Sequence, residues 1–130
     1  MERLSQWAKD YFTYLKSAMG KAYEILEVNG RLELRHADYS EEIICMEKLK
    51  KPTKANHQII ITMNTKQNLS TLIKDWKSFC IPNLKLYFVN PSKPLLKLVL
   101  SPFVHDKVCE PKNLARSLKS MIKAAFETSK

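Results

Sequence analysis

Two groups of basic side chains are the strongest chemical signal in the sequence. Near the C-terminal end, four of them stand at helical intervals: Lys112, Arg116, Lys119 and Lys123. On a helix this spacing forms one stripe away from the apolar face. The second group lies in a short segment interrupted by a proline: Lys48, Lys50, Lys51 and Lys54. Like charges repel, and a polyanion relieves the repulsion because each neutralised phosphate releases condensed counterions. Both groups therefore predict contacts with the phosphates of a nucleic acid; lysines extended into water are the alternative.

The distribution of charge along the chain points the same way. The 130 residues carry 22 Lys and Arg against 13 Asp and Glu, a formal net charge of +9. Residues 1–47 hold six basic and nine acidic side chains, whereas residues 48–130 hold 16 basic and four acidic ones. Such an asymmetry creates one strongly positive region, and phosphate backbones are common partners of such a field. Because no aromatic-rich RNP motif is present, the sequence predicts backbone contact rather than reading of a base sequence.

Other kinds of site find little support. His105 and Cys109 are the one pair with ligand-like spacing, but a structural zinc ion needs four ligands, usually as two close pairs. The chain has two glycines, too few for a Walker loop or a dinucleotide fingerprint. It also lacks the G-x-S-x-G and H-E-x-x-H motifs. We therefore expect no cofactor and no metal, and the sequence favours a binding protein over an enzyme.

The polar run His105-Asp106-Lys107 leaves two interpretations open. It stands between an expected strand and an expected helix, and loops often carry functional residues. A surface turn with a local ion pair is the other interpretation, and the one we favour.

The three cysteines indicate the redox state of the compartment in which the protein is expected. Cys45, Cys80 and Cys109 are odd in number, widely spaced and without a C-x-x-C pair. The sequence starts without the apolar segment of a secretory signal, and no run approaches the roughly 18 apolar residues that span a bilayer. We expect a reduced, cytoplasmic protein with no membrane partner, in which the cysteines fill apolar space rather than act as nucleophiles.

The elements that must position these side chains follow from hydrophobic periodicity. Apolar residues at helical spacing over residues 4–26 predict a long first helix. Asn29-Gly30 is either the left-handed cap of that helix or the turn of a β-hairpin between residues 23–28 and 31–36. The helical pattern reaching Leu26 favours the cap.

The rest of the chain alternates between strands and helices. We expect strands over residues 31–36, 42–47, 58–63, 84–89 and 95–100, with the first two antiparallel and residues 58–63 central because they are apolar on both faces. A helix capped by Thr65 or Asn68 is expected to run to Phe79, and a final helix to begin at Glu110. The sequence thus predicts one α/β domain over residues 1–130, in the order α-β-β-β-α-β-β-α, with a mixed sheet flanked by helices.

This order of elements resembles the αβββαβ core of the PD-(D/E)XK nuclease-like superfamily, over residues 4–89. In that family an acidic residue on the second strand and an acidic-x-Lys element on the third hold a divalent metal. Glu41 and Glu42 open the second expected strand and match the first position, but residues 58–63 contain neither a carboxylate nor a lysine. Either the similarity of order is accidental, or the fold has lost its chemistry and kept a binding role.

Together these features predict a non-catalytic basic domain that binds DNA or RNA through phosphate contacts. The alternative is an interaction or assembly subunit, in which the acidic first third meets the basic remainder of another copy or of a protein partner. A residual metal-dependent nuclease using Glu41 and Glu42 is the third hypothesis.

Overall fold

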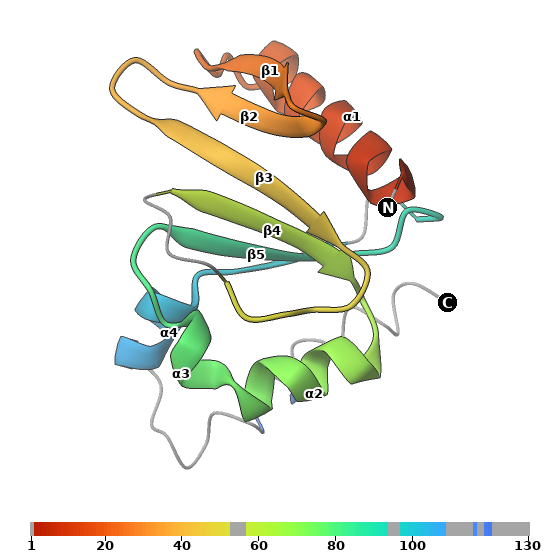
Figure 1. Ribbon diagram of the computed structural model, residues 1–130, viewed down its shortest axis with the longest axis vertical. Helices are drawn as coiled ribbons and strands as arrows, with labels where there is room; N and C mark the ends of the chain where they lie inside the picture. The colour runs from red at the N-terminus through yellow and green to blue at the C-terminus, as the bar shows by residue number, and fades with distance from the viewer. Residues whose placement is uncertain (1, 53–56, 94–96, 109–115, 117–118, 121–130) are drawn as a thin grey trace.

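The computed structural model describes residues 2–52, 57–93, 97–108, 116 and 119–120. Within them, six strands form one mixed sheet in the order β1-β2-β3-β4-β5-β6, with helices against both faces (Figure 1). The helices are α1 (Glu2–Ala18), α2 (Lys66–Lys74), α3 (Trp76–Phe79) and α4 (Pro102–Val108). The strands are β1 (Glu24–Val28), β2 (Arg31–Arg35), β3 (Ser40–Met46), β4 (Gln58–Met63), β5 (Leu84–Val89) and β6 (Lys97–Leu100). The predicted fold class, a mixed sheet flanked by helices, is confirmed.

The sheet separates two hydrophobic cores. β4 is buried on both faces, as its apolar sequence predicted. On one face α1 buries four side chains that are at most 5% exposed: Leu4, Trp7, Ala8 and Phe12. On the other face α2 and α3 bury Leu72, Trp76 and Phe79 against Leu86 and Phe88 of β5. Burial of each large apolar side chain contributes about 1.5–3 kcal/mol, so this layering accounts for the order of the elements.

The first helix is shorter than predicted. It ends at Ala18, and residues 24–28 form β1, which pairs antiparallel with β2 from Glu24↔Arg35 to Val28↔Arg31. Asn29 and Gly30 both have positive φ, 52° and 78°, as a two-residue hairpin turn requires. The favoured cap was therefore wrong and the hairpin alternative right. A ladder with β2 satisfies the backbone of residues 24–28, and Gly20, at φ 65°, lies in the break after the helix.

Two further boundaries differ from expectation. The predicted helix ending at Phe79 is divided at Asp75, whose backbone departs from helical geometry before α3 begins. The polar run after β6 was expected to lie in a turn, but α4 begins at Pro102, a first helical position at which a missing N–H costs nothing. The predicted turn at His105-Asp106-Lys107 is therefore helical. The final helix expected from Glu110 lies outside the described residues, apart from Arg116 and Lys119.

The first residues of the connection from β3 to β4 are fixed by hydrogen bonds to α2. The two strands are parallel, and no helix is described between them. Asn68 of α2 is 2% exposed and accepts a 2.9 Å hydrogen bond from the Leu49 N–H. Its Nδ2 lies 2.8 Å from the Glu47 and Met63 carbonyl oxygens and 3.0 Å from Thr62 Oγ1. Thr65, rather than Asn68, caps α2, so Asn68 is free to hold this connection. The connection, which carries the connector lysines Lys48, Lys50 and Lys51, is therefore fixed to α2 at Leu49.

Replacement of Asn68 by Ala tests this role. The variant leaves the Leu49 N–H buried without its partner, at a cost of about 1–3 kcal/mol, and removes one of the two hydrogen bonds that the Glu47 and Met63 carbonyl oxygens each accept. We expect the free energy of unfolding to fall by about 3 kcal/mol in urea denaturation. Gln67→Ala, at the exposed neighbouring position of the same helix, should change it by less than about 0.5 kcal/mol. Equal effects of the two variants would contradict the role assigned to Asn68.

Candidate functional site

The carboxyl ends of the parallel strands carry a group of basic side chains, here called the basic edge. Because β3, β4 and β5 are parallel and in register, residues that follow them emerge at the same edge of the sheet. The basic edge comprises Lys48, Lys50, Lys51, Lys66, Lys93 and Arg3. Arg3 joins it from the start of α1, since its Nη2 donates a 2.8 Å hydrogen bond to Ser92 Oγ. All but the half-buried Lys93 are exposed.

The cations of the basic edge are not neutralised by ion pairs. Within the described chain, none of its six side chains lies within 4 Å of a carboxylate oxygen. Glu47, at the end of β3, contributes one opposing charge nearby. At the amino ends of the same strands the situation is reversed, because Arg31 pairs with Glu42 and Lys85 with Glu41. Among the described residues, Glu41 and Glu42 at the amino ends of the strands are thus paired with basic groups, whereas the six cations at the carboxyl ends have no ion pair.

The predicted basic residues have different outcomes. Lys48, Lys50 and Lys51 are exposed and lie together on the connection that Asn68 holds. Arg116 and Lys119 are exposed and helical, as predicted. Lys54, Lys112 and Lys123 lie outside the described residues. The structure adds Arg3, Lys66 and Lys93 to the connector lysines, through the parallel pairing of strands that are distant in sequence.

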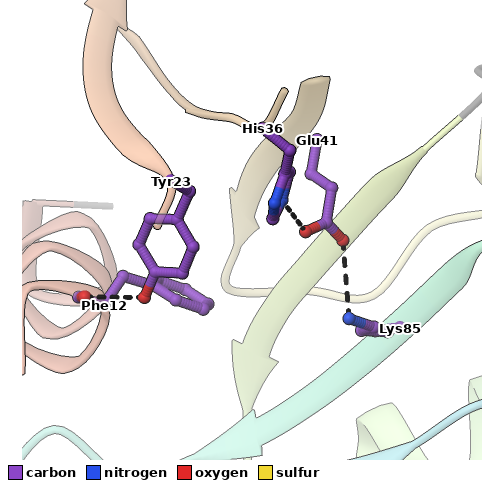
Figure 2. Close-up of polar contacts among 5 residues, drawn as sticks. All are labelled: Phe12, Tyr23, His36, Glu41 and Lys85. Atoms are coloured by element: carbon purple, nitrogen blue, oxygen red, sulfur yellow. Dashed lines mark hydrogen bonds and ion pairs between the residues drawn. The ribbon is translucent and has the colours of Figure 1, made fainter. Parts of the chain in front are cut away.

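The amino ends of the strands hold a second polar group, the Glu41 cluster of His36, Glu41 and Lys85. Glu41 is 5% exposed, its Oε1 lies 2.8 Å from Nε2 of His36, and its Oε2 lies 3.6 Å from Nζ of Lys85 (Figure 2). Lys85 comes from β5 and reaches over β4 to the carboxylate of β3. A buried carboxylate is costly unless it is paired, and two basic groups meet that need here.

The Glu41 cluster forms the floor of an open hollow of about 690 Å³. Phe12 and Leu15 of α1 form one wall and Ile59 of β4 lies below. Lys21 and Arg35 stand at its border with their side chains exposed. Such a size, with apolar walls and a few converging polar groups, is typical of small-molecule sites.

Aromatic rings support the cluster from both sides. The His36 ring stacks on Tyr39 at 4.3 Å between centroids, and His57 packs on Tyr39 at the same distance. The Tyr23 hydroxyl donates a 2.7 Å hydrogen bond to the Phe12 carbonyl, which ties the start of β1 to α1 (Figure 2). Burial raises the pKa of Tyr23 and, more strongly, that of Tyr87 above the ordinary value of 10. The neutral phenol is therefore the stable form of both rings.

The run His105-Asp106-Lys107 has a structural role. Asp106 accepts a 2.8 Å hydrogen bond from Trp76 Nε1, and Lys77 Nζ lies 3.4 Å from its other oxygen. The Trp76 N–H, followed by the Lys77 charge, lowers the pKa of Asp106. The His105 ring packs edge-on against Trp76. These contacts fasten α4 to α3, and the ion pair is to a different helix rather than local.

Glu41 and Glu42 do not converge on one cation. Neighbouring residues of a strand point to opposite faces, so Glu41 faces α1 whereas Glu42 faces the other side and pairs with Arg31. Among the described residues, no three His, Cys, Asp or Glu side chains gather as a metal site would require. The two carboxylates that the residual-nuclease hypothesis invokes therefore lie on opposite faces of the sheet.

The cysteines of the described chain are free thiols. Cys45 and Cys80 are half-buried and pack against the two cores. Burial raises the pKa of both thiols, which keeps them protonated and weakly nucleophilic. Cys109 lies outside the described residues, so the structure does not bear on its ligand-like spacing from His105.

Sequence reasoning singled out Glu41 but missed its partners. His36 was expected at the end of one strand and Lys85 within another, 44 positions after Glu41. The sequence signal that could have indicated this cluster was a charged residue on each of two otherwise apolar strands. It becomes informative only once the strand order and the register are known.

Comparison with known proteins gives no further guide. No protein-family model matches the chain, and no curated protein or solved structure is detectably similar to it. The resemblance to the PD-(D/E)XK nuclease-like superfamily therefore stays a prediction. In the described part of the chain, no helix has the length and apolar character needed to cross a membrane.

The raised pKa of Tyr87 predicts a loss of stability in alkali. Unfolded tyrosine ionises near pH 10, whereas buried Tyr87 keeps its proton, so above about pH 10 the unfolded state binds fewer protons. We expect the free energy of unfolding to fall with pH there, by up to about 1.4 kcal/mol per pH unit for this residue. Tyr87→Phe should reduce that slope in denaturation series at rising pH. An unchanged slope in the variant would contradict the assignment.

Proposed function

We propose that the protein binds the phosphate backbone of DNA or RNA through the basic edge. The observation that carries the proposal is the group of six basic side chains at one edge of the sheet, none of which has an ion pair within the described part of the chain, whereas Glu41 and Glu42 at the opposite edge are paired. Cations at the same edge of the sheet repel one another, and neutralising phosphates with them releases counterions. The contacts need no enzyme chemistry, in agreement with the expected non-catalytic role.

The way the lysines are held also supports this function. Lys48 flanks Leu49, which is 5% exposed and fixed through its N–H to Asn68. Lys66 begins α2 beside the same Asn68. A backbone held in place loses less conformational entropy on binding than a free loop. Arg116 and Lys119, exposed in the C-terminal part of the chain, are proposed to extend the contact.

The proposal includes a cytoplasmic setting, where the free thiols stay reduced. The assembly alternative remains a distinct prediction, in which the basic edge meets an acidic surface of another copy. Sedimentation at low and high salt separates the two, because self-association changes the mass of the protein in the absence of nucleic acid.

The salt dependence of binding tests the proposal. We expect the affinity for a labelled oligonucleotide, measured by fluorescence anisotropy, to fall at least 10-fold between about 50 and about 200 mM salt. In Lys50→Gln/Lys51→Gln the slope of log affinity against log salt should become shallower by about 1 for each phosphate that the variant no longer neutralises. Affinity that does not respond to salt would refute phosphate binding.

A matched double variant controls for the reduced net charge. Lys16→Gln/Lys74→Gln removes two exposed lysines from the last turns of α1 and α2, away from the basic edge. Both double variants lower the net charge by the same amount, so a general field effect lowers affinity equally. A contact at the basic edge requires the larger decrease of affinity in Lys50→Gln/Lys51→Gln.

A further inference from the structure

We propose that the hollow above the Glu41 cluster is a nucleotide-binding site, which takes a nucleobase against Glu41 and Lys85 and its phosphate near Lys21 and Arg35. This site lies at the amino ends of the parallel strands, opposite the basic edge, and it does not depend on the function proposed above. Its central group is a carboxylate that is 5% exposed and yet borders an open hollow.

The floor of the hollow offers an acceptor beside a donor. Glu41 Oε1 is held by His36 at 2.8 Å, which fixes the carboxylate in place. Oε2 lies 3.6 Å from Lys85 Nζ, an ion-pair distance that is too long for a hydrogen bond. Within the described chain Lys85 Nζ makes no hydrogen bond, so its three donors and Oε2 both retain bonding capacity. Figure 2 shows the two groups directed toward each other.

The edge of a nucleobase complements this pair. Its Watson–Crick edge places an N–H donor next to a nitrogen or oxygen acceptor, and proteins that receive single bases read that edge by hydrogen bonds. The N–H would donate to Glu41 Oε2 while the neighbouring acceptor takes a bond from Lys85. Leu15, which is half-buried, and Tyr39, which is 42% exposed, line the hollow and offer the apolar surface that a heterocycle requires. A plain phosphate would leave both this surface and Glu41 unused, and a sugar would leave the apolar surface unused.

The border of the hollow suits the phosphate of the same ligand. Lys21, in the segment between α1 and β1, and Arg35, at the end of β2, both line it and are exposed. Arg35 is 4.0 Å from Glu33, a loose contact that a phosphate can replace. Glu24 also lines the hollow, so the border carries two cations against one carboxylate. The ligand is therefore a nucleotide, either free or as an unpaired residue of a strand.

Calorimetric titration of the full chain with adenosine monophosphate and with ribose 5-phosphate tests the site. We expect the mononucleotide to bind with a Kd below about 1 mM and ribose 5-phosphate at least 10-fold more weakly. Glu41→Gln replaces the acceptor by a partly donating amide and should weaken mononucleotide binding at least 10-fold. Lys85→Met, at a half-exposed position, should do the same and serves if Glu41→Gln fails to fold. Glu42→Gln, the neighbouring carboxylate on the other face, is the matched control and should bind as the parent does.

A second titration distinguishes a free nucleotide from an unpaired residue of a nucleic-acid strand. A strand residue in the hollow predicts that Lys85→Met weakens binding of a single-stranded oligonucleotide but not of a duplex. A free nucleotide predicts that both are unchanged while mononucleotide binding is abolished. Absence of mononucleotide binding by the parent, equal affinity for ribose 5-phosphate, or full binding by Lys85→Met would each overturn the proposal. Failure of the basic edge is detected separately, since Lys50→Gln/Lys51→Gln leaves the hollow intact.

Discussion

The parallel pairing of β3, β4 and β5 decides where the charged side chains of this protein lie. Parallel strands in register send the residues that follow them to one edge of the sheet and those that precede them to the other. The lysines after β3 and β4 thereby meet at the carboxyl ends, and Glu41 and Lys85 meet at the amino ends. If β4 were antiparallel, the residues before and after it would change ends, and neither group of charged side chains would form. The two proposed binding surfaces thus depend on one topological feature.

Parallel pairing of β3 and β4 also explains why Asn68 must supply hydrogen bonds to the connection between them. A right-handed crossover between parallel strands usually contains a helix that covers its own backbone groups. The connection from β3 to β4 has no described helix, so its first residues need hydrogen-bond partners from elsewhere. A single buried amide on α2 provides them for Glu47 and Leu49. The same side chain therefore stabilises the second core and holds the backbone that carries the connector lysines.

The two polar groups differ in how their charge is compensated. In the Glu41 cluster, burial makes an unpaired carboxylate costly, so His36 and Lys85 gather around it. At the basic edge the side chains are exposed, water solvates each cation, and no carboxylate is needed for folding. A charge that the fold itself neutralises, as at Glu41, indicates a preformed polar site. Charges without such partners, as at the basic edge, indicate a surface that is available to a binding partner. The resemblance to nuclease-like folds rests on element order and adds no chemistry to either surface.

The sequence by itself determined the elements with strong local signals. Periodicity predicted the first helix, though not its end at Ala18, and the central strand β4, because burial of an apolar stripe or face depends on residues a few positions apart; the cap of α2 stayed open between Thr65 and Asn68. It also fixed the excess of positive charge and the exposure of the connector lysines. It could not decide between cap and hairpin at Asn29-Gly30, since both conformations need positive φ and only pairing with β2 favours the hairpin. The contact of Glu41 with Lys85, and that of Arg3 with Ser92, was decided by tertiary structure alone, because packing, strand order and register bring together residues that no local pattern connects.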